Sequence, residues 1–173
     1  SLHDALPIYV RALYNLIHTG NSLPQDYVAI AQRIIGWVYH GGRGGLPQDY
    51  TEAAKWFLKA AERGDAEAQY EISGMYQIAR GVPQVDAEAH RWKLAAAEQG
   101  LIIAQRTLGL NYETGMHGAQ QSFSDAMKWY VRAAEEGGYW SETLLGGLYR
   151  DGNGTPQNFC DAFMRYLVST AAR

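Results

Sequence analysis

One sequence feature constrains the fold more than any other: the same residues return at a nearly constant interval of 36 or 37 residues. Three independent sets of markers keep this period. They are the tyrosines Tyr39, Tyr76, Tyr112 and Tyr149, the tryptophans Trp56, Trp92 and Trp129, and the glycines Gly64, Gly100 and Gly137. Such a period is typical of supersecondary units that stack on their neighbours. The chain is therefore predicted to fold as a repeat array, with these markers in structural positions.

Each unit is predicted to begin with a helix that runs from a small residue to an apolar residue and then to the marker tyrosine. These residues are four positions apart, so they share one helical face. The residue after the apolar one is also small, and in three units it is a glycine: Gly36, Gly109 and Gly146. A loop that contains glycine or proline follows the tyrosine and is expected to end the helix.

The second helix of each unit is predicted from its capping residues. Three units place a side-chain oxygen three residues before a carboxylate, a pattern that starts helices. These pairs are Asp49 with Glu52, Ser122 with Asp125, and Asn158 with Asp161. The second unit departs, because Val85 stands at its cap position. The helices then carry Ala-x-x-Trp and end in Ala-Ala-Glu-x-Gly, and we expect the tryptophans to fill the space between units.

These motifs resemble the Sel-one-like repeat, a relative of the tetratricopeptide repeat. The resemblance covers about residues 29–173, and the segments that match closely are 36–39, 47–50, 53–64, 104–112 and 126–137. It implies an all-α fold: an α/α superhelical solenoid of antiparallel helix pairs. It also implies a concave face, lined mainly by first helices, that binds other proteins, and a bacterial source. The tetratricopeptide repeat itself fits less well, since it is shorter and lacks the long glycine loop.

The pattern predicts units at about residues 31–64, 68–100, 104–137 and 141–173. Residues 9–28 are predicted to be a truncated or compressed repeat, because the Leu-Pro-Gln-Asp-Tyr of 23–27 returns at 46–50, too soon for a full unit. Residues 1–8 match the translation of a common sequencing adapter and are expected to be an artefact. We therefore expect a fragment whose own N-terminus is missing, which leaves a cytoplasmic and a periplasmic or secreted location equally open.

Composition narrows the partners and cofactors. The net charge is −3, with 15 basic and 18 acidic residues, which argues against nucleic acid as a partner. The sequence lacks an apolar run long enough for membrane insertion. None of the five histidines stands at metal-ligand spacing from a cysteine or a carboxylate, so neither a metal nor another cofactor is expected. The single cysteine, Cys160, allows no intrachain disulfide.

No catalytic constellation is visible in the sequence. The glycine-rich run at 41–45 lacks the Lys-Ser/Thr ending of a phosphate loop. The chain is therefore predicted to be a scaffold without enzymatic activity that binds a protein or peptide in the concave groove. Aromatic and arginine side chains on first helices are the best candidates for contact residues, although ordinary surface scatter would also explain them. These candidates are Arg33, Trp37, Tyr70, Arg106 and Trp140.

Two other functions remain open at this stage. The array could be a docking arm of a larger bacterial protein. The resemblance also includes cysteine-rich relatives linked to β-lactam binding or hydrolysis, which carry a disulfide in each repeat. The present chain departs from them, because it has only Cys160 and lacks a Ser-x-x-Lys motif.

Overall fold

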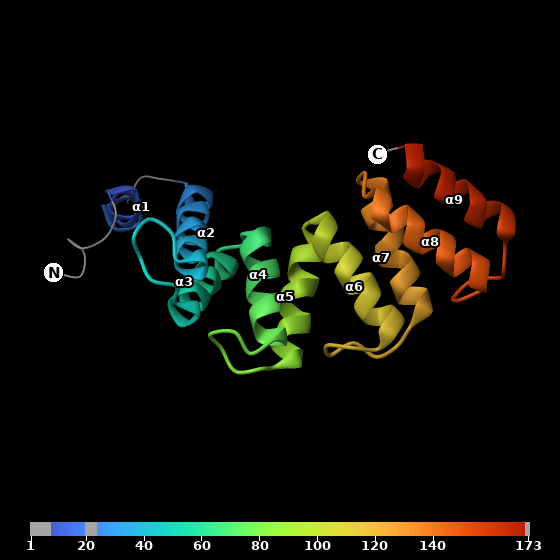
Figure 1. Cartoon of the computed structure of the whole chain (residues 1–173), viewed down its shortest axis with the longest axis horizontal. Helices are drawn as coiled ribbons and strands as arrows, with labels where there is room; N and C mark the ends of the chain where they lie inside the picture. Colours follow the sequence, from blue (N-terminus) through green and yellow to red (C-terminus); the bar gives the residue numbers. More distant parts are fainter. Residues whose placement is uncertain (1–7, 20–23, 172–173) are drawn as a thin grey trace. The chain divides into compact units, whose positions relative to one another are not determined.

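The computed structural model describes residues 8–19 and 24–171, and this part of the chain contains nine α-helices and no β-strand. The helices are α1 (Ile8–Thr19), α2 (Gln25–Gly41), α3 (Tyr50–Glu62), α4 (Ala66–Gln77), α5 (Asp86–Glu98), α6 (Ile102–Thr114), α7 (Phe123–Glu135), α8 (Tyr139–Asp151) and α9 (Phe159–Ala171). Several helices that follow each other in sequence lie side by side, for example α6 with α7 and α8 with α9 (Figure 1). The predicted all-α fold of paired helices is confirmed.

The chain divides into two compact units, residues 1–92 and 93–173, and the boundary falls inside α5. Of the segment 1–8, residues 1–7 lie outside the described residues, and Ile8 is the first residue of α1. The segment between the two copies of Leu-Pro-Gln-Asp-Tyr lies largely in one continuous helix, α2, which packs against both α1 and α3.

The core of the first unit contains two clusters of buried side chains. One joins Phe57, Ile72, Met75 and Trp92 with alanines of α3 and α4, whose small side chains let these helices approach closely. The other joins α1 to α2 and α3. It consists of Val10, Ile35, Val38 and Trp56. Trp56 and Trp92 therefore both lie in the core of this unit.

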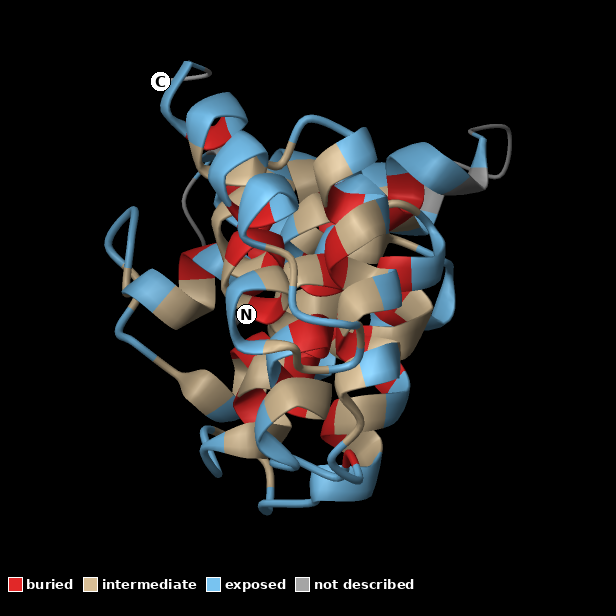
Figure 2. Cartoon of the chain, turned by 90° about the vertical axis from the view of Figure 1, so that its right-hand side faces the viewer, coloured by how far each residue is buried: buried red, intermediate tan, exposed pale blue. Residues whose placement is uncertain are grey.

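The core of the second unit is centred on Tyr130, which packs with Ala126, Leu145 and Leu148. In Figure 2 the buried residues colour only parts of each helix surface, whereas the loops are largely exposed. Trp129 differs from the two earlier tryptophans, because it is only half-buried, and the Arg132 guanidinium lies 4.8 Å from the centroid of its ring.

The glycines after the apolar residue of the first helices are required by packing. A Cβ atom on Gly36 would lie 2.8 Å from the ring of Phe57, and one on Gly109 would lie 2.5 Å from the ring of Tyr130. Gly146 has the same relation to Tyr166, at 2.8 Å. In each case an aromatic ring of the second helix lies directly on the backbone of the first.

The loops between first and second helices close in the same way four times. The carbonyl oxygen of each marker tyrosine accepts a hydrogen bond from the backbone N–H of the residue that precedes the second helix. The pairs are Tyr39 and Asp49 (2.9 Å), Tyr76 and Val85 (3.2 Å), Tyr112 and Ser122 (2.8 Å), and Tyr149 and Asn158 (2.8 Å). The tyrosine backbone thus helps to fix where each second helix begins, including the one that starts after Val85.

The predicted side-chain caps are confirmed in three of the sequence repeats. Asp49 accepts from the N–H groups of Thr51 and Glu52 at 2.9 and 3.0 Å. Ser122 accepts from one N–H group of α7, and Asn158 accepts from two of α9. The glycines that follow the second helices, Gly64, Gly100 and Gly137, have φ angles of +93°, +88° and +92°, a conformation that L side chains rarely adopt.

Candidate functional site

Two of the five predicted contact residues, Arg106 and Trp140, line one pocket in the second unit. The pocket has a volume of about 430 Å³ and lies between α6 and α8. Its other lining residues are Thr107, Leu110, Thr143 and Leu144. The side chains of Trp140 and Leu110 are large and apolar, yet they remain 47% and 46% exposed. The pocket therefore presents apolar surface to solvent.

Helical spacing explains why these side chains meet. On each helix the lining residues are three or four positions apart or adjacent to one that is, so they form one strip of the helix surface. The inward strip of the same helices carries Leu108 and Leu145, which are fully buried. Trp140 lies in the first turn of α8, next to Tyr139, with 5.2 Å between the two ring centroids.

The charge of Arg106 is the main electrostatic feature of this pocket. Its guanidinium forms no ion pair with any residue that the structure describes. Glu142, near the start of α8, is already paired with Arg165 of α9 at 2.9 Å. The other lining residues of the pocket are neutral, so Arg106 supplies a positive charge beside an apolar surface.

The other three predicted contact residues lie in the first unit. Arg33 of α2 is engaged by two carboxylates of the following segment, at 3.0 Å from Asp65 and 2.6 Å from Glu67. Trp37 is 38% exposed, and its ring meets the ring of Phe57 edge-on with 5.5 Å between the two ring centroids. Tyr70 is half-buried on α4. The guanidinium of Arg33 is thus occupied within its own unit.

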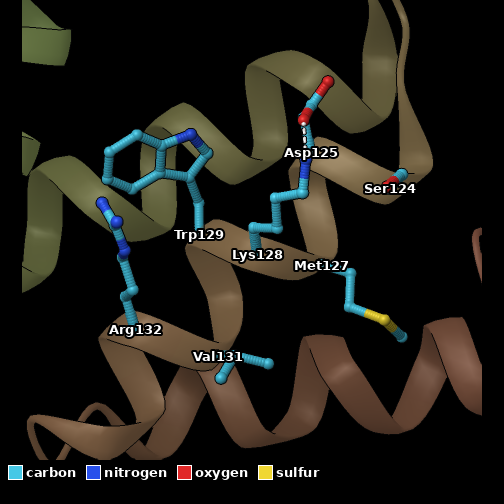
Figure 3. Close-up of a pocket in the computed structure, with 7 residues that line it drawn as sticks. All are labelled: Ser124, Asp125, Met127, Lys128, Trp129, Val131 and Arg132. Carbon is cyan, nitrogen blue, oxygen red and sulfur yellow. Dashed lines mark hydrogen bonds and ion pairs between the residues drawn. The ribbon is translucent and has the colours of Figure 1, made fainter.

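A second pocket, of about 590 Å³, lies along α7 and was not predicted from the sequence. Figure 3 shows Arg132 beside the ring of Trp129, while Met127 and Val131 project from another side of the helix. Lys128 is paired with Asp125 at 2.8 Å. The guanidinium of Arg132 lies 4.8 Å from the centroid of the Trp129 ring, so the cations of this pocket both contact residues of their own helix, which makes it a weaker candidate than the pocket of Arg106 and Trp140.

A third pocket, of about 310 Å³ in the first unit, contains titratable groups. Burial, together with the nearby charge of Glu67, raises the pKa of Glu71 to about 7, and burial lowers the pKa of His40. Glu71 occupies a repeat position that elsewhere holds Ile34, Thr107 or Leu144. This departure from the pattern was the signal that sequence reasoning missed. Among the described residues that line this pocket there is no serine, threonine, cysteine, lysine or tyrosine.

Within residues 8–19 and 24–171, no group of three or more histidine, cysteine, aspartate or glutamate side chains is arranged to hold a metal ion. Not one of the helices in the same ranges has both the length and the apolar character needed to cross a bilayer.

Comparison with known proteins gives a consistent family. The sequence pattern of the Sel1 repeat matches four segments: 29–65, 66–101, 102–138 and 141–163. No curated protein is a significant match to the chain.

Two solved structures resemble the chain over 94% of its length, each with a TM-score of 0.80. One is a protective antigen of uropathogenic Escherichia coli that displays an SLR fold, at 30% identity, and the other is a Sel1 repeat protein from Oxalobacter formigenes, at 32%. The chain spans 37% and 62% of the lengths of these two proteins. Cysteine rich protein B of Helicobacter pylori shares the fold at 18% identity and a TM-score of 0.55, over 72% of this chain and 89% of that one.

Proposed function

Because the chain belongs to the Sel1 repeat family, whose members are generally scaffolds for protein–protein interaction, we propose that it is a non-catalytic adaptor that binds a protein or peptide. We assign the principal contact to the first-helix surface of the second unit, at the α6–α8 pocket. The observation that carries this assignment is the half-exposed indole of Trp140 beside Leu110 and Leu144.

Leaving these apolar side chains in water has a free-energy cost that a bound partner would remove. Apolar surface contributes about 25 cal/mol per Å² when it is removed from water, and tryptophan and arginine are enriched among residues that dominate binding energy. The pocket combines both residue types with a concave apolar lining. In the pocket on α7 the lysine is paired with an aspartate and the arginine lies over a tryptophan ring, whereas Arg33 of the first unit is engaged by two carboxylates.

The proposal can be tested by selecting displayed random peptides that bind the immobilised protein and then measuring their affinity for variants. We expect Trp140→Ala to abolish or strongly weaken binding. Phe163→Ala is the matched control, because Phe163 is a 61% exposed aromatic residue on α9, away from the lining of the pocket. Selected peptides that bind both variants as well as the unmodified protein would contradict the proposed site.

A second candidate function is that of a docking arm within a longer protein. It is supported by the greater length of the two relatives, of which the chain spans only part. The two functions are compatible, since a docking arm also needs a contact surface. Peptide binding that persists in this chain alone supports the adaptor role, whereas binding that appears only with flanking domains supports the docking arm.

A further inference from the structure

Resting on the proposed function of the α6–α8 pocket, we infer the chemistry of its partner: a protein segment that places an Asp or Glu side chain on Arg106 while a neighbouring apolar side chain enters the pocket beside Trp140. This pocket and the same repeat positions in the first unit share a helical framework but differ at the residues that surround the arginine.

The first unit shows what an arginine at this position binds. Arg33 is the second residue after the small residue that starts the repeat pattern of α2. Its Nε lies 3.0 Å from a carboxylate oxygen of Asp65, and its Nη1 lies 2.6 Å from Glu67. Both acids belong to the start of the next first helix, α4. Two carboxylates from the neighbouring helix therefore neutralise this guanidinium.

The second unit keeps the arginine and loses both acids. Arg106 occupies the position of Arg33, two repeats later in the sequence. The positions of Asp65 and Glu67 are taken by Gly138 and Trp140. The tryptophan supplies apolar surface where the glutamate supplied a charge. As a result Arg106 forms no ion pair with any described residue, although its position is the one that binds carboxylates in the first unit.

The start of α8 adds to the same charge deficit. In the first unit Asp65 also caps α4, accepting from the N–H of Ala68 at 2.8 Å. Gly138, at the equivalent position, gives α8 no side-chain cap. A helix N-terminus carries a partial positive charge, so an incoming carboxylate near Trp140 would be favoured by this end of α8 as well as by Arg106. The helix end alone would not define a site, and Arg106 supplies the specific partner.

The apolar part of the partner follows from the remaining lining. Leu110, Leu144 and the indole of Trp140 form a surface suited to an aliphatic or aromatic side chain. Ion pairs beside such a surface are stronger than those in open water, because the dielectric constant is lower and salt screens them less. A segment with an apolar residue and an acid within about one helical turn satisfies both requirements together.

The inference is tested with random peptides displayed between fixed flanking residues, which removes any free C-terminal carboxylate. Selected sequences are then synthesised with acetylated and amidated ends for affinity measurement. We expect enrichment of an apolar residue close to Asp or Glu. Replacing that acid with its amide should weaken binding about tenfold or more, and Arg106→Glu should do the same. Arg106→Glu should also restore binding to a peptide in which the acid is replaced by lysine.

Two further variants make the result interpretable. Arg132→Glu introduces the same charge change on α7 of the same unit, at an exposed residue that does not line the α6–α8 pocket, and should leave binding nearly unchanged. Arg106→Gln removes the charge without reversing it, and serves if Arg106→Glu does not fold by circular dichroism. Equal losses for Arg132→Glu and Arg106→Glu would overturn the inference.

The two proposals fail in different ways. Peptides that require Trp140 but carry no acid, and that bind Arg106→Gln normally, would overturn the carboxylate inference and leave the adaptor site standing. Selected peptides whose binding is independent of Trp140 would instead remove the proposed site itself. Acid-dependent peptides that require both residues would support both proposals.

Discussion

The contact between Gly109 and Tyr130 gives the sharpest test of how the repeat is packed. A Cβ atom added to Gly109 would lie 2.5 and 2.7 Å from two carbons of the Tyr130 ring, and 3.2 Å from the carbonyl oxygen of Ala126. Tyr130 is fully buried, and its hydroxyl donates to Glu113 at 2.7 Å. To reach an ordinary contact of 3.4 Å, the ring would have to move by roughly 1 Å within a filled core.

The expected magnitude follows from two opposing effects. Overpacking a core costs about 1–3 kcal/mol, whereas replacing glycine with alanine inside a helix gains about 1 kcal/mol of helix propensity. The difference between the two gives a net destabilisation of up to about 2 kcal/mol for Gly109→Ala. Gly147→Ala on α8 is the matched control, because a Cβ there meets nothing within 4 Å. That variant should be more stable by about 0.5–1 kcal/mol.

Urea unfolding followed by far-ultraviolet circular dichroism measures both variants under the same conditions, and the midpoints should shift in opposite directions. A change in slope would show that more than the folded-state contact has been altered. If Gly109→Ala stabilises the protein as much as Gly147→Ala does, the ring does not lie against the backbone as described, and the explanation for the repeated glycine is wrong.

Three further changes have signs that follow from burial. Trp92→Ala should lower the free energy of unfolding in urea by about 3–5 kcal/mol, because Trp92 is 7% exposed and the neighbouring alanines are too small to fill the cavity. An unchanged unfolding curve would show that Trp92 does not belong to the core. Glu71→Gln should flatten the pH dependence of melting. Because burial raises the pKa of Glu71 from 4.5 to about 7, the protonated carboxyl group stabilises the fold below pH 4.5. This contribution, about 1 kcal/mol after allowing for solvent screening, is lost as the pH rises through 7. Lys93→Met removes a buried charge but leaves the side-chain oxygen of Asn111 without its donor, so these two effects, about 1–3 kcal/mol each, should nearly cancel at pH 7. Because burial lowers the pKa of Lys93 to about 8 from 10.5, the unmodified protein should gain stability between pH 8 and 10.5, and a variant that keeps this gain would refute the assignment.

The helices and their ends could be predicted from sequence because their causes are local. A capping oxygen and a glycine with positive φ act within one turn of the chain, as Asp49 and Gly64 do. The period also indicated how the helices pair, since every repeat has a small residue on its first helix and three of the four have an aromatic ring at one position of the second helix. For Gly36 and Gly109 the sequence showed the small residue, and the structure adds the ring that requires it.

The candidate site was less predictable because its properties depend on residues of a neighbouring helix. Arg33 and Arg106 share one repeat position and were predicted together as contact residues. One is bound by two carboxylates, and the other has no ion pair among the described residues. The position of an arginine in the repeat fixes the surface on which it lies, whereas the residues at the start of the next first helix decide whether its charge is available.

Buried polar residues show the same dependence in the core. Lys93 stands where the other second helices have Phe57, Tyr130 or Tyr166, and Asn111 stands where the first helices have an aliphatic or methionine side chain. When the side-chain amide of Asn111 is oriented so that both its oxygen and its nitrogen have partners, the oxygen accepts a hydrogen bond from Lys93 Nζ at 3.2 Å. Either residue without the other would leave a polar group buried without a partner, so these two departures from the repeat pattern are explained only as a pair.

This coupling bears on where function is to be sought in a repeat protein. Positions that most repeats keep, such as the glycine–ring contacts of three repeats, are explained by packing and carry no information about a partner. Positions where one unit departs from the others are informative when the departure leaves a group unsatisfied. At Lys93 the departure is compensated inside the protein by Asn111, so it indicates a structural role. At Arg106 the two acids of the first unit are replaced by Gly138 and Trp140, and no described residue supplies the missing charge. Arg106 is half-exposed, so the charge of its guanidinium is available to a carboxylate of a partner, which is why the second unit is the stronger candidate for binding.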